Sequence, residues 1–116
     1  MEPVAAPSPV RIVLLDDHEM VIEGLKAMLA AFEDRVCVVG HAVGAERAVE
    51  VVAELDPDIV LCDVRMQNTS GLDLCLTLRE QAPHRKVVML SVYDDEQYLY
   101  QASRVGASGY LLTSIS

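Results

Sequence analysis

The chain has 116 residues, of which 52% are hydrophobic and 23% charged, and this length and composition fit one globular domain with one core. Its formal net charge of -9 argues against direct binding of nucleic acid, which needs a basic surface, and suits a cation site or basic partners. No apolar run approaches the roughly 18 residues of a membrane span and no signal peptide is visible, so we expect a cytoplasmic protein that does not contact a membrane.

The first segment of the chain differs from the rest in composition. Residues 1–9 hold three of the five prolines and predict an irregular leader before a single domain at residues 10–116. The three cysteines, Cys37, Cys62 and Cys75, lie far apart without a C-x-x-C pair. We interpret them as small buried hydrophobic residues in a reducing compartment.

Five short aliphatic runs predict the strands of the fold. Each run is continuously apolar rather than alternating, which is typical of strands buried on both faces of a parallel sheet. The runs are residues 11–15, 36–40, 58–62, 86–90 and 109–112.

Helical spacing of apolar residues fills the segments between these runs. A third helix is predicted to begin after the N-cap Ser70 and to stop before Pro83, and a fourth, at about residues 95–105, to end at Gly106. The apolar positions of the first two helices are Val21, Leu25, Met28 and Phe32, and then Ala48, Val51, Val52 and Leu55.

The alternation of strands and helices predicts a doubly wound α/β fold with a five-stranded parallel sheet and helices on both faces. After the fifth strand only residues 113–116 remain, too few for a fifth helix that closes one face. We expect either that the natural protein continues beyond Ser116 or that another chain covers this surface.

Polar residues follow the strands at the edge of the sheet where open α/β proteins form their sites. Asp16 and Asp17 follow the first strand, Asp63 the third, Ser91 the fourth and Thr113 the fifth. If the first and third strands are neighbours, three carboxylates converge, and like charges about 4 Å apart repel by roughly 1–4 kcal/mol per pair. A Mg²⁺ ion would offset this repulsion, because it binds carboxylates and keeps positions open for phosphate oxygens.

This placement suggests phosphoryl chemistry. Asp63 beside Mg²⁺ could attack phosphorus and form an acyl phosphate, while Ser91 donates a hydrogen bond to a phosphoryl oxygen. The structural alternatives are a helix cap for Asp16 and Asp17 and a turn residue for Asp63. Their joint occurrence at the ends of two buried strands favours the functional interpretation. His18, without a second histidine at ligand spacing, is interpreted as a surface residue of the first helical turn.

Four motifs in order resemble the receiver domain of bacterial two-component response regulators, a flavodoxin-like fold. They are "LLDDH", "VLCDVRM" followed by Gly71, "VVMLS" and "GASGYLL", and they extend from about Arg11 to Thr113. The stretch "DDHEMVIEGL" further resembles the LuxR/NarL-type branch, whose members carry a C-terminal helix-turn-helix domain that binds DNA.

The resemblance implies a role for each residue of the acidic edge. Asp63 corresponds to the phosphoacceptor, which receives its phosphoryl group from a sensor histidine kinase. Asp16 and Asp17 correspond to the acidic pair, and Asp17, Asp63 and the backbone carbonyl of Arg65 to the Mg²⁺ ligands.

The resemblance also implies a switch, and this chain departs from the family's pattern at two positions. Ser91 corresponds to the switch hydroxyl and Tyr110 to the aromatic residue that changes rotamer with it, so that phosphorylation biases a two-state surface around the fourth helix and fifth strand. Gln67 stands where the family usually has proline, which changes the loop. Thr113 stands where the family has a lysine, and a lost charge-assisted bond of roughly 1.5–3 kcal/mol predicts inefficient phosphorylation.

We therefore expect the receiver domain of a longer transcriptional regulator, a regulatory module rather than a turnover enzyme. The implied partners are a histidine kinase, Mg²⁺ and a second receiver in a homodimer, with DNA bound only by a downstream segment. One alternative, which Thr113 supports, is a receiver controlled by a ligand or by constitutive dimerisation instead of phosphate. The other is a phosphatase with an aspartate nucleophile, but Arg65 stands where that chemistry usually needs a general acid.

Overall fold

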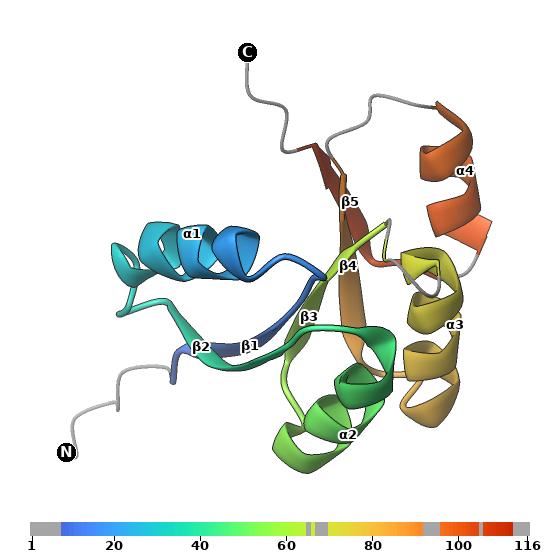
Figure 1. Cartoon of the computed structure of the whole chain (residues 1–116). Helices are drawn as coiled ribbons and strands as arrows, with labels where there is room; N and C mark the ends of the chain where they lie inside the picture. Colours follow the sequence, from blue (N-terminus) through green and yellow to red (C-terminus); the bar gives the residue numbers. More distant parts are fainter. Residues whose placement is uncertain (1–7, 65, 67–69, 92–95, 105, 113–116) are drawn as a thin grey trace, which may run out of the picture.

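One five-stranded parallel sheet forms the centre of the protein, as the computed structural model shows (Figure 1). The structure describes residues 8–64, 66, 70–91, 96–104 and 106–112, with the backbone alone for residues 96–99 and 112. The strands are β1 (Val10–Leu15), β2 (Val36–Ala42), β3 (Ile59–Asp63), β4 (Lys86–Ser91) and β5 (Gly109–Leu112). They lie in the order β2-β1-β3-β4-β5, and each predicted strand is confirmed to within two residues at either end.

Four helices alternate with the strands and cover both faces of the sheet. They are α1 (Glu19–Ala30), α2 (Ala45–Leu55), α3 (Gly71–Gln81) and α4 (Glu96–Arg104). Helix α1 lies on one face, and α2, α3 and α4 lie on the other (Figure 1). This confirms the doubly wound α/β prediction.

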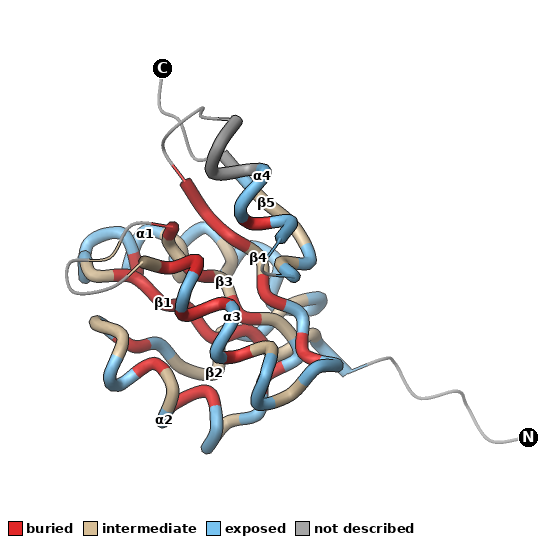
Figure 2. Tube along the Cα trace, turned by 90° about the vertical axis from the view of Figure 1, so that its right-hand side faces the viewer, coloured by how far each residue is buried: buried red, intermediate tan, exposed pale blue. Residues whose placement is uncertain are grey.

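The core follows the alternation of side chains along each strand. In β1, Val13 and Leu15 pack in the larger cluster with α2 and α3, while Ile12 and Leu14 pack on the other face with Ile22 of α1. The central strands are therefore buried on both sides, and Figure 2 shows the buried stretches concentrated in them. Two buried faces explain why these runs are continuously apolar.

The buried face of α1 differs from the predicted one. Ile22 is buried there, with Leu25 and Leu29 packed against the sheet. The predicted positions Val21 and Met28 are 44% and 69% exposed, and Phe32, which is 52% exposed, lies beyond the end of the helix. Ile22, Leu25 and Leu29 have helical spacing too, so α1 carries two apolar stripes and spacing alone did not identify the inner one.

The predicted helix boundaries hold where capping residues set them. The Ser70 hydroxyl accepts a hydrogen bond from the Leu72 N–H at 3.1 Å at the start of α3, which ends two residues before Pro83. Gly106 has a φ of 84° after α4, in the left-handed region that favours glycine.

The cysteines are not all buried. Cys62 and Cys75 lie in the core as expected, but Cys37 is exposed because it belongs to β2, which pairs with another strand on one side only. Its expected burial was wrong. Within the described residues, no helix is long and apolar enough to cross a membrane.

The topology creates a switch point between β1 and β3. The chain leaves β1 towards β2 on one side, and β3 returns on the other side. Leu15 pairs with Cys62, so the residues that follow, Asp16 and Asp63, are at the same level of the sheet. In open α/β sheets, such a point at the carboxyl ends of the strands is where ligands bind.

Candidate functional site

Asp16 lies at the base of the site, directly after β1. It is only 3% exposed, and its N–H donates to the Ala42 carbonyl at 3.2 Å, which continues the sheet by one residue. Its Oδ1 accepts a hydrogen bond from the His18 N–H at 2.9 Å. This carboxylate therefore fixes the turn between β1 and α1 and remains under the surface, where a charge needs compensation.

Asp63 is the last residue of β3 and is partly buried. The chain beyond it is held on both sides: the Val64 N–H donates to the Leu90 carbonyl at 2.9 Å, and the Gly71 N–H donates to the Val64 carbonyl at 2.8 Å. A Cβ on Gly71 would lie 1.8 Å from the carbonyl oxygen of Asp63. Only glycine lets the start of α3 pass this close to the aspartate.

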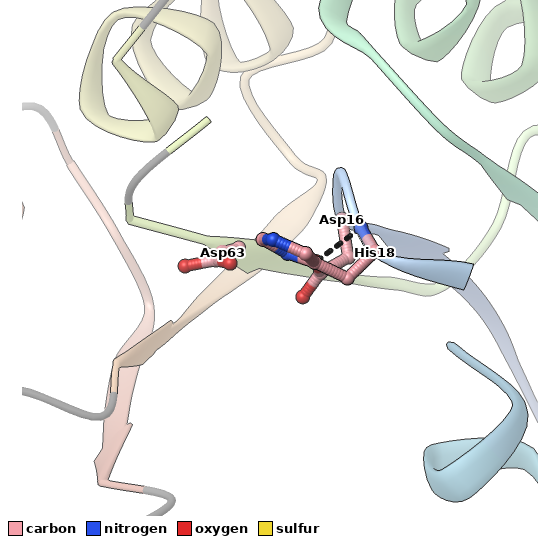
Figure 3. Close-up of side chains that lie close together, drawn as sticks. All are labelled: Asp16, His18 and Asp63. Atoms are coloured by element: carbon pink, nitrogen blue, oxygen red, sulfur yellow. Dashed lines mark hydrogen bonds and ion pairs between the residues drawn. The ribbon is translucent and has the colours of Figure 1, made fainter. Parts of the chain in front are cut away.

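Asp16, His18 and Asp63 form one cluster. A potential metal-ligand atom of each residue lies within 4.8 Å of those of the other two. Figure 3 shows the imidazole of His18 reaching from the start of α1 towards Asp63, with its Nδ1 at 3.2 Å from Oδ1 of Asp16. Of the three carboxylates expected to converge, Asp16 and Asp63 lie in this cluster, and so does His18, which was expected at the surface.

Asp17 is close to this cluster but is not one of its three members. It follows Asp16 and is partly buried. Its charge acts on the same buried thiol as the other two carboxylates: burial raises the pKa of Cys62 far above its ordinary value, Cys75 adds to the rise, and the charges of Asp63, Asp16 and Asp17 add further. Three carboxylates thus act on one buried thiol next to the end of β3.

Ser91 and Tyr110 lie on the two strands beyond Asp63. Ser91 ends β4 and is 2% exposed. Tyr110 is in β5, where it pairs with Met89 and packs against the core on the side of α2, α3 and α4. Its hydroxyl is buried and has no hydrogen-bond partner among the described residues. Arg65 and Thr113 lie outside the residues that the structure describes.

The donor set fits a divalent cation. Two carboxylates at the ends of neighbouring strands supply the hard oxygen ligands that Mg²⁺ takes, and the partly exposed Asp63 leaves the cluster open to solvent and to a phosphate. The imidazole nitrogen adds a softer ligand.

Comparison with known proteins gives a family for this arrangement. Residues 12–116 match the response regulator receiver domain family. The transcriptional regulatory protein MctR of Rhizobium johnstonii is 37% identical over 107 residues, 92% of this chain and 50% of that protein. The nitrate/nitrite response regulator NarL of Escherichia coli K12 is 38% identical over 104 residues, 90% of this chain and 48% of that protein. The chain spans about half the length of these curated relatives.

Solved structures agree with the family. The signal receiver domain of NarL from Mycobacterium tuberculosis has a TM-score of 0.84 at 32% identity, covering 95% of this chain and 88% of that one. A LuxR-family response regulator from Aurantimonas has a TM-score of 0.86 at 28% identity, covering 92% and 76%. The family match, the sequence relatives and the solved structures agree, so the chain belongs to the response regulator receiver domains. Its homologues are two-component transcriptional regulators of the NarL and LuxR type.

Proposed function

We propose that this domain accepts a phosphoryl group from a sensor histidine kinase on Asp63, with Mg²⁺, and that phosphorylation switches dimerisation and the activity of an output domain. The observation that carries the proposal is the convergence of Asp16 and Asp63 at the switch point of the sheet. Carboxylate oxygens within 4.8 Å of each other repel. A bound cation would offset this repulsion and would explain why both side chains are present.

The reaction follows from the position of Asp63. An oxygen of its carboxylate attacks the phosphorus of a phosphohistidine, the P–N bond breaks, and the electron pair returns to the imidazole of the kinase. Bound Mg²⁺ would neutralise charge on the phosphoryl oxygens, and Asp16, Asp17, Asp63 and the Arg65 carbonyl are the proposed ligands. The Ser91 hydroxyl would then donate to a phosphoryl oxygen.

Tyr110 suits the role of a switch residue. Its buried hydroxyl has no partner among the described residues. Leaving a buried hydroxyl unpaired costs about 1–3 kcal/mol, so a rotamer that gives the hydroxyl a partner would compete with the present one. A change of rotamer that follows movement of Ser91 would alter the surface around α4 and β5, where we place the homodimer contact. DNA would be bound by a downstream helix-turn-helix domain.

Labelling with acetyl phosphate and Mg²⁺ tests the proposal. We expect mass spectrometry to locate the phosphoryl group on Asp63, and the Asp63→Asn variant to lose it because an amide is not a nucleophile for phosphorus. Asp73→Asn is the matched control, since Asp73 is an exposed aspartate in the first turn of α3. Equal labelling of Asp63→Asn and the unsubstituted protein would refute the proposal.

A receiver controlled without phosphate is the second candidate, because Thr113 stands in place of the family's lysine. If the lost charge is the only defect, Thr113→Lys raises the extent of acetyl-phosphate labelling by about tenfold to a hundredfold, the equivalent of 1.5–3 kcal/mol. Thr113→Met, which adds length without charge, should stay at the starting level. Equal labelling of all three proteins would show that Thr113 does not limit phosphorylation.

A further inference from the structure

Strand β2 forms one edge of the sheet. It pairs with β1, and no strand lies on its other side among the residues that the structure describes (Figure 1). We propose that this edge binds an extended peptide, which pairs with β2 as a sixth strand. The surface is separate from the acidic cluster of Asp16, His18 and Asp63, because none of these residues lines it.

A groove of about 430 Å³ surrounds the edge of β2, and we call it the β2 groove. It is lined by residues 38–41 of β2, by Lys26 of α1 on one side, and by Val51, Glu54 and Leu55 of α2 on the other. Helices α1 and α2 cover opposite faces of the sheet (Figure 1). A strand added at this edge would therefore have one helix on each side, and its alternating side chains would face the two helices in turn.

The β2 groove is apolar next to the strand on both faces of the sheet. Val38 packs on the side of α1, whereas Val39 packs in the cluster that contains the buried face of α2. Val39 is the extra residue of a β-bulge in the pairing with β1. A Cβ at Gly40 would overlap with Leu55, so Leu55 lies directly against the strand. The groove thus offers apolar contacts to both faces of an added strand.

The sequence of β2 leaves its edge open to pairing. Edge strands usually avoid pairing with other chains by carrying charged residues or proline. Residues 36–42 read VCVVGHA and contain no carboxylate, lysine, arginine or proline. The bulge at Val39 interrupts the edge at one point, which favours a short partner over a long one. Main-chain hydrogen bonds would give such a partner affinity, and the groove on either side would give specificity.

The charges beside the strand indicate the character of the peptide. Lys26 lies on the α1 side and Glu54 on the α2 side. The Lys26 side chain is 33% exposed and its Nζ lies 3.5 Å from the Glu23 carboxylate, a surface pair that a ligand can replace at little cost. An acidic residue of the peptide would thus face α1, and a basic residue an odd number of positions away would face α2.

A second copy of the chain fits this edge less well than a peptide does. Two-fold pairing of β2 with β2 keeps the faces of the two sheets in common, so α1 would lie beside α1 and α2 beside α2. Lys26 would then meet Lys26, and Glu54 would meet Glu54. Like charges placed opposite each other destabilise strand pairing.

NMR titration of the isotope-labelled protein with a probe peptide tests the proposal. The probe is acetyl-Val-Thr-Glu-Val-Val-Lys-Val-amide, which has the length of β2 and carries one charge of each sign on opposite faces. Its control has the same sequence with N-methyl groups on the three central residues, which removes main-chain donors from both edges of the peptide.

We expect the probe to shift the amide signals of residues 36–42 and to slow hydrogen exchange there, and the N-methylated control to bind about tenfold more weakly or worse. No binding of the probe, equal affinities for the two peptides, or shifts confined to other residues would overturn the inference. So would a dimer in sedimentation of the protein alone that Val38→Lys dissociates, because a second copy would then occupy the edge.

A pair of lysine variants tests the charge of the groove. Lys26→Glu should weaken binding of the probe about twofold to fivefold, because it reverses the charge on the α1 side. Lys86→Glu is the matched control, since Lys86 is the other lysine of the chain and is exposed at the start of β4. Circular dichroism checks that both variants fold. Equal weakening by the two substitutions would overturn the assignment of the peptide to this groove.

Discussion

Cys62 is fully buried beside the site. It precedes Asp63 in β3, and its thiol lies 3.5 Å from the Asp63 carbonyl and 3.8 Å from the Gly71 carbonyl. Burial raises the pKa of this thiol, with further contributions from Cys75 and the three carboxylates, so it stays neutral in the folded protein. A thiolate there would add a fourth negative charge to the acidic edge.

The raised pKa of Cys62 predicts a loss of stability at alkaline pH. Above its ordinary value of 9.0 the thiol ionises in the unfolded chain but not in the folded one, so the unfolded state binds fewer protons and the free energy of unfolding falls as pH rises. Below that value both states hold the proton, and the thiol contributes no slope.

Urea unfolding between about pH 7 and 10 measures this effect. Above about pH 9, the unsubstituted protein should lose up to about 1.4 kcal/mol per pH unit more than Cys62→Ala. Cys37→Ala is the control, because it removes a thiol that is exposed in the folded protein. Parallel pH profiles for the unsubstituted protein and Cys62→Ala would contradict the assigned environment.

At the scale of elements, the start of α3 determines how Asp63 is presented. Gly71 packs directly against the Asp63 carbonyl, and Ser70 caps the helix beside it. A methyl group at residue 71 would overlap the backbone, which must then shift at the end of β3.

We expect Gly71→Ala to lower the free energy of unfolding by about 1–3 kcal/mol, the usual cost of overpacking. Gly24→Ala is a matched control in the exposed middle of α1, where nothing lies within 4 Å of the added Cβ. There alanine should stabilise by about 0.5–1 kcal/mol through its greater helix propensity. Chemical denaturation gives both values, and a stabilising Gly71→Ala would show that α3 does not approach Asp63 this closely.

Individual elements show what the sequence could predict. The five strands and the boundaries of α3 depend on local signals, namely continuous apolar runs, Ser70 and Pro83, and these predictions are confirmed. The inner face of α1 was predicted only in part, because two apolar stripes share Leu25, which packs against the core as expected, while the other predicted positions are exposed. The burial of Cys37 was predicted wrongly, because a sequence does not reveal which strand is at the edge.

The site was predictable only in part. Carboxylates at strand ends can be read from the order of residues, since parallel strands end at one edge. The inclusion of His18 depends on the direction of a side chain at the N-cap, and the "DDH" spacing alone does not give that direction. The roles of the site residues stay predictions, namely those of Asp16, Asp17, Asp63, Arg65, Ser91, Tyr110 and Thr113.

At the scale of the whole molecule, the fold brings together charges that repel. The switch between β1 and β3 places Asp16 and Asp63 in one cluster, in a protein whose net charge is -9. Without a cation, the repulsion between these carboxylates lowers the stability of the folded state. Binding of a cation should stabilise the folded state relative to the unfolded chain, which has no such site.

The most direct test of this account is the stabilisation that Mg²⁺ gives. At a Mg²⁺ concentration ten times its Kd, the free energy of unfolding should rise by about 1.4 kcal/mol in the unsubstituted protein and in Asp73→Asn. Asp63→Asn should show a much smaller rise at the same concentration, because one of the two converging carboxylates is lost. An equal rise in Asp63→Asn would contradict the claim that Asp16 and Asp63 share one cation.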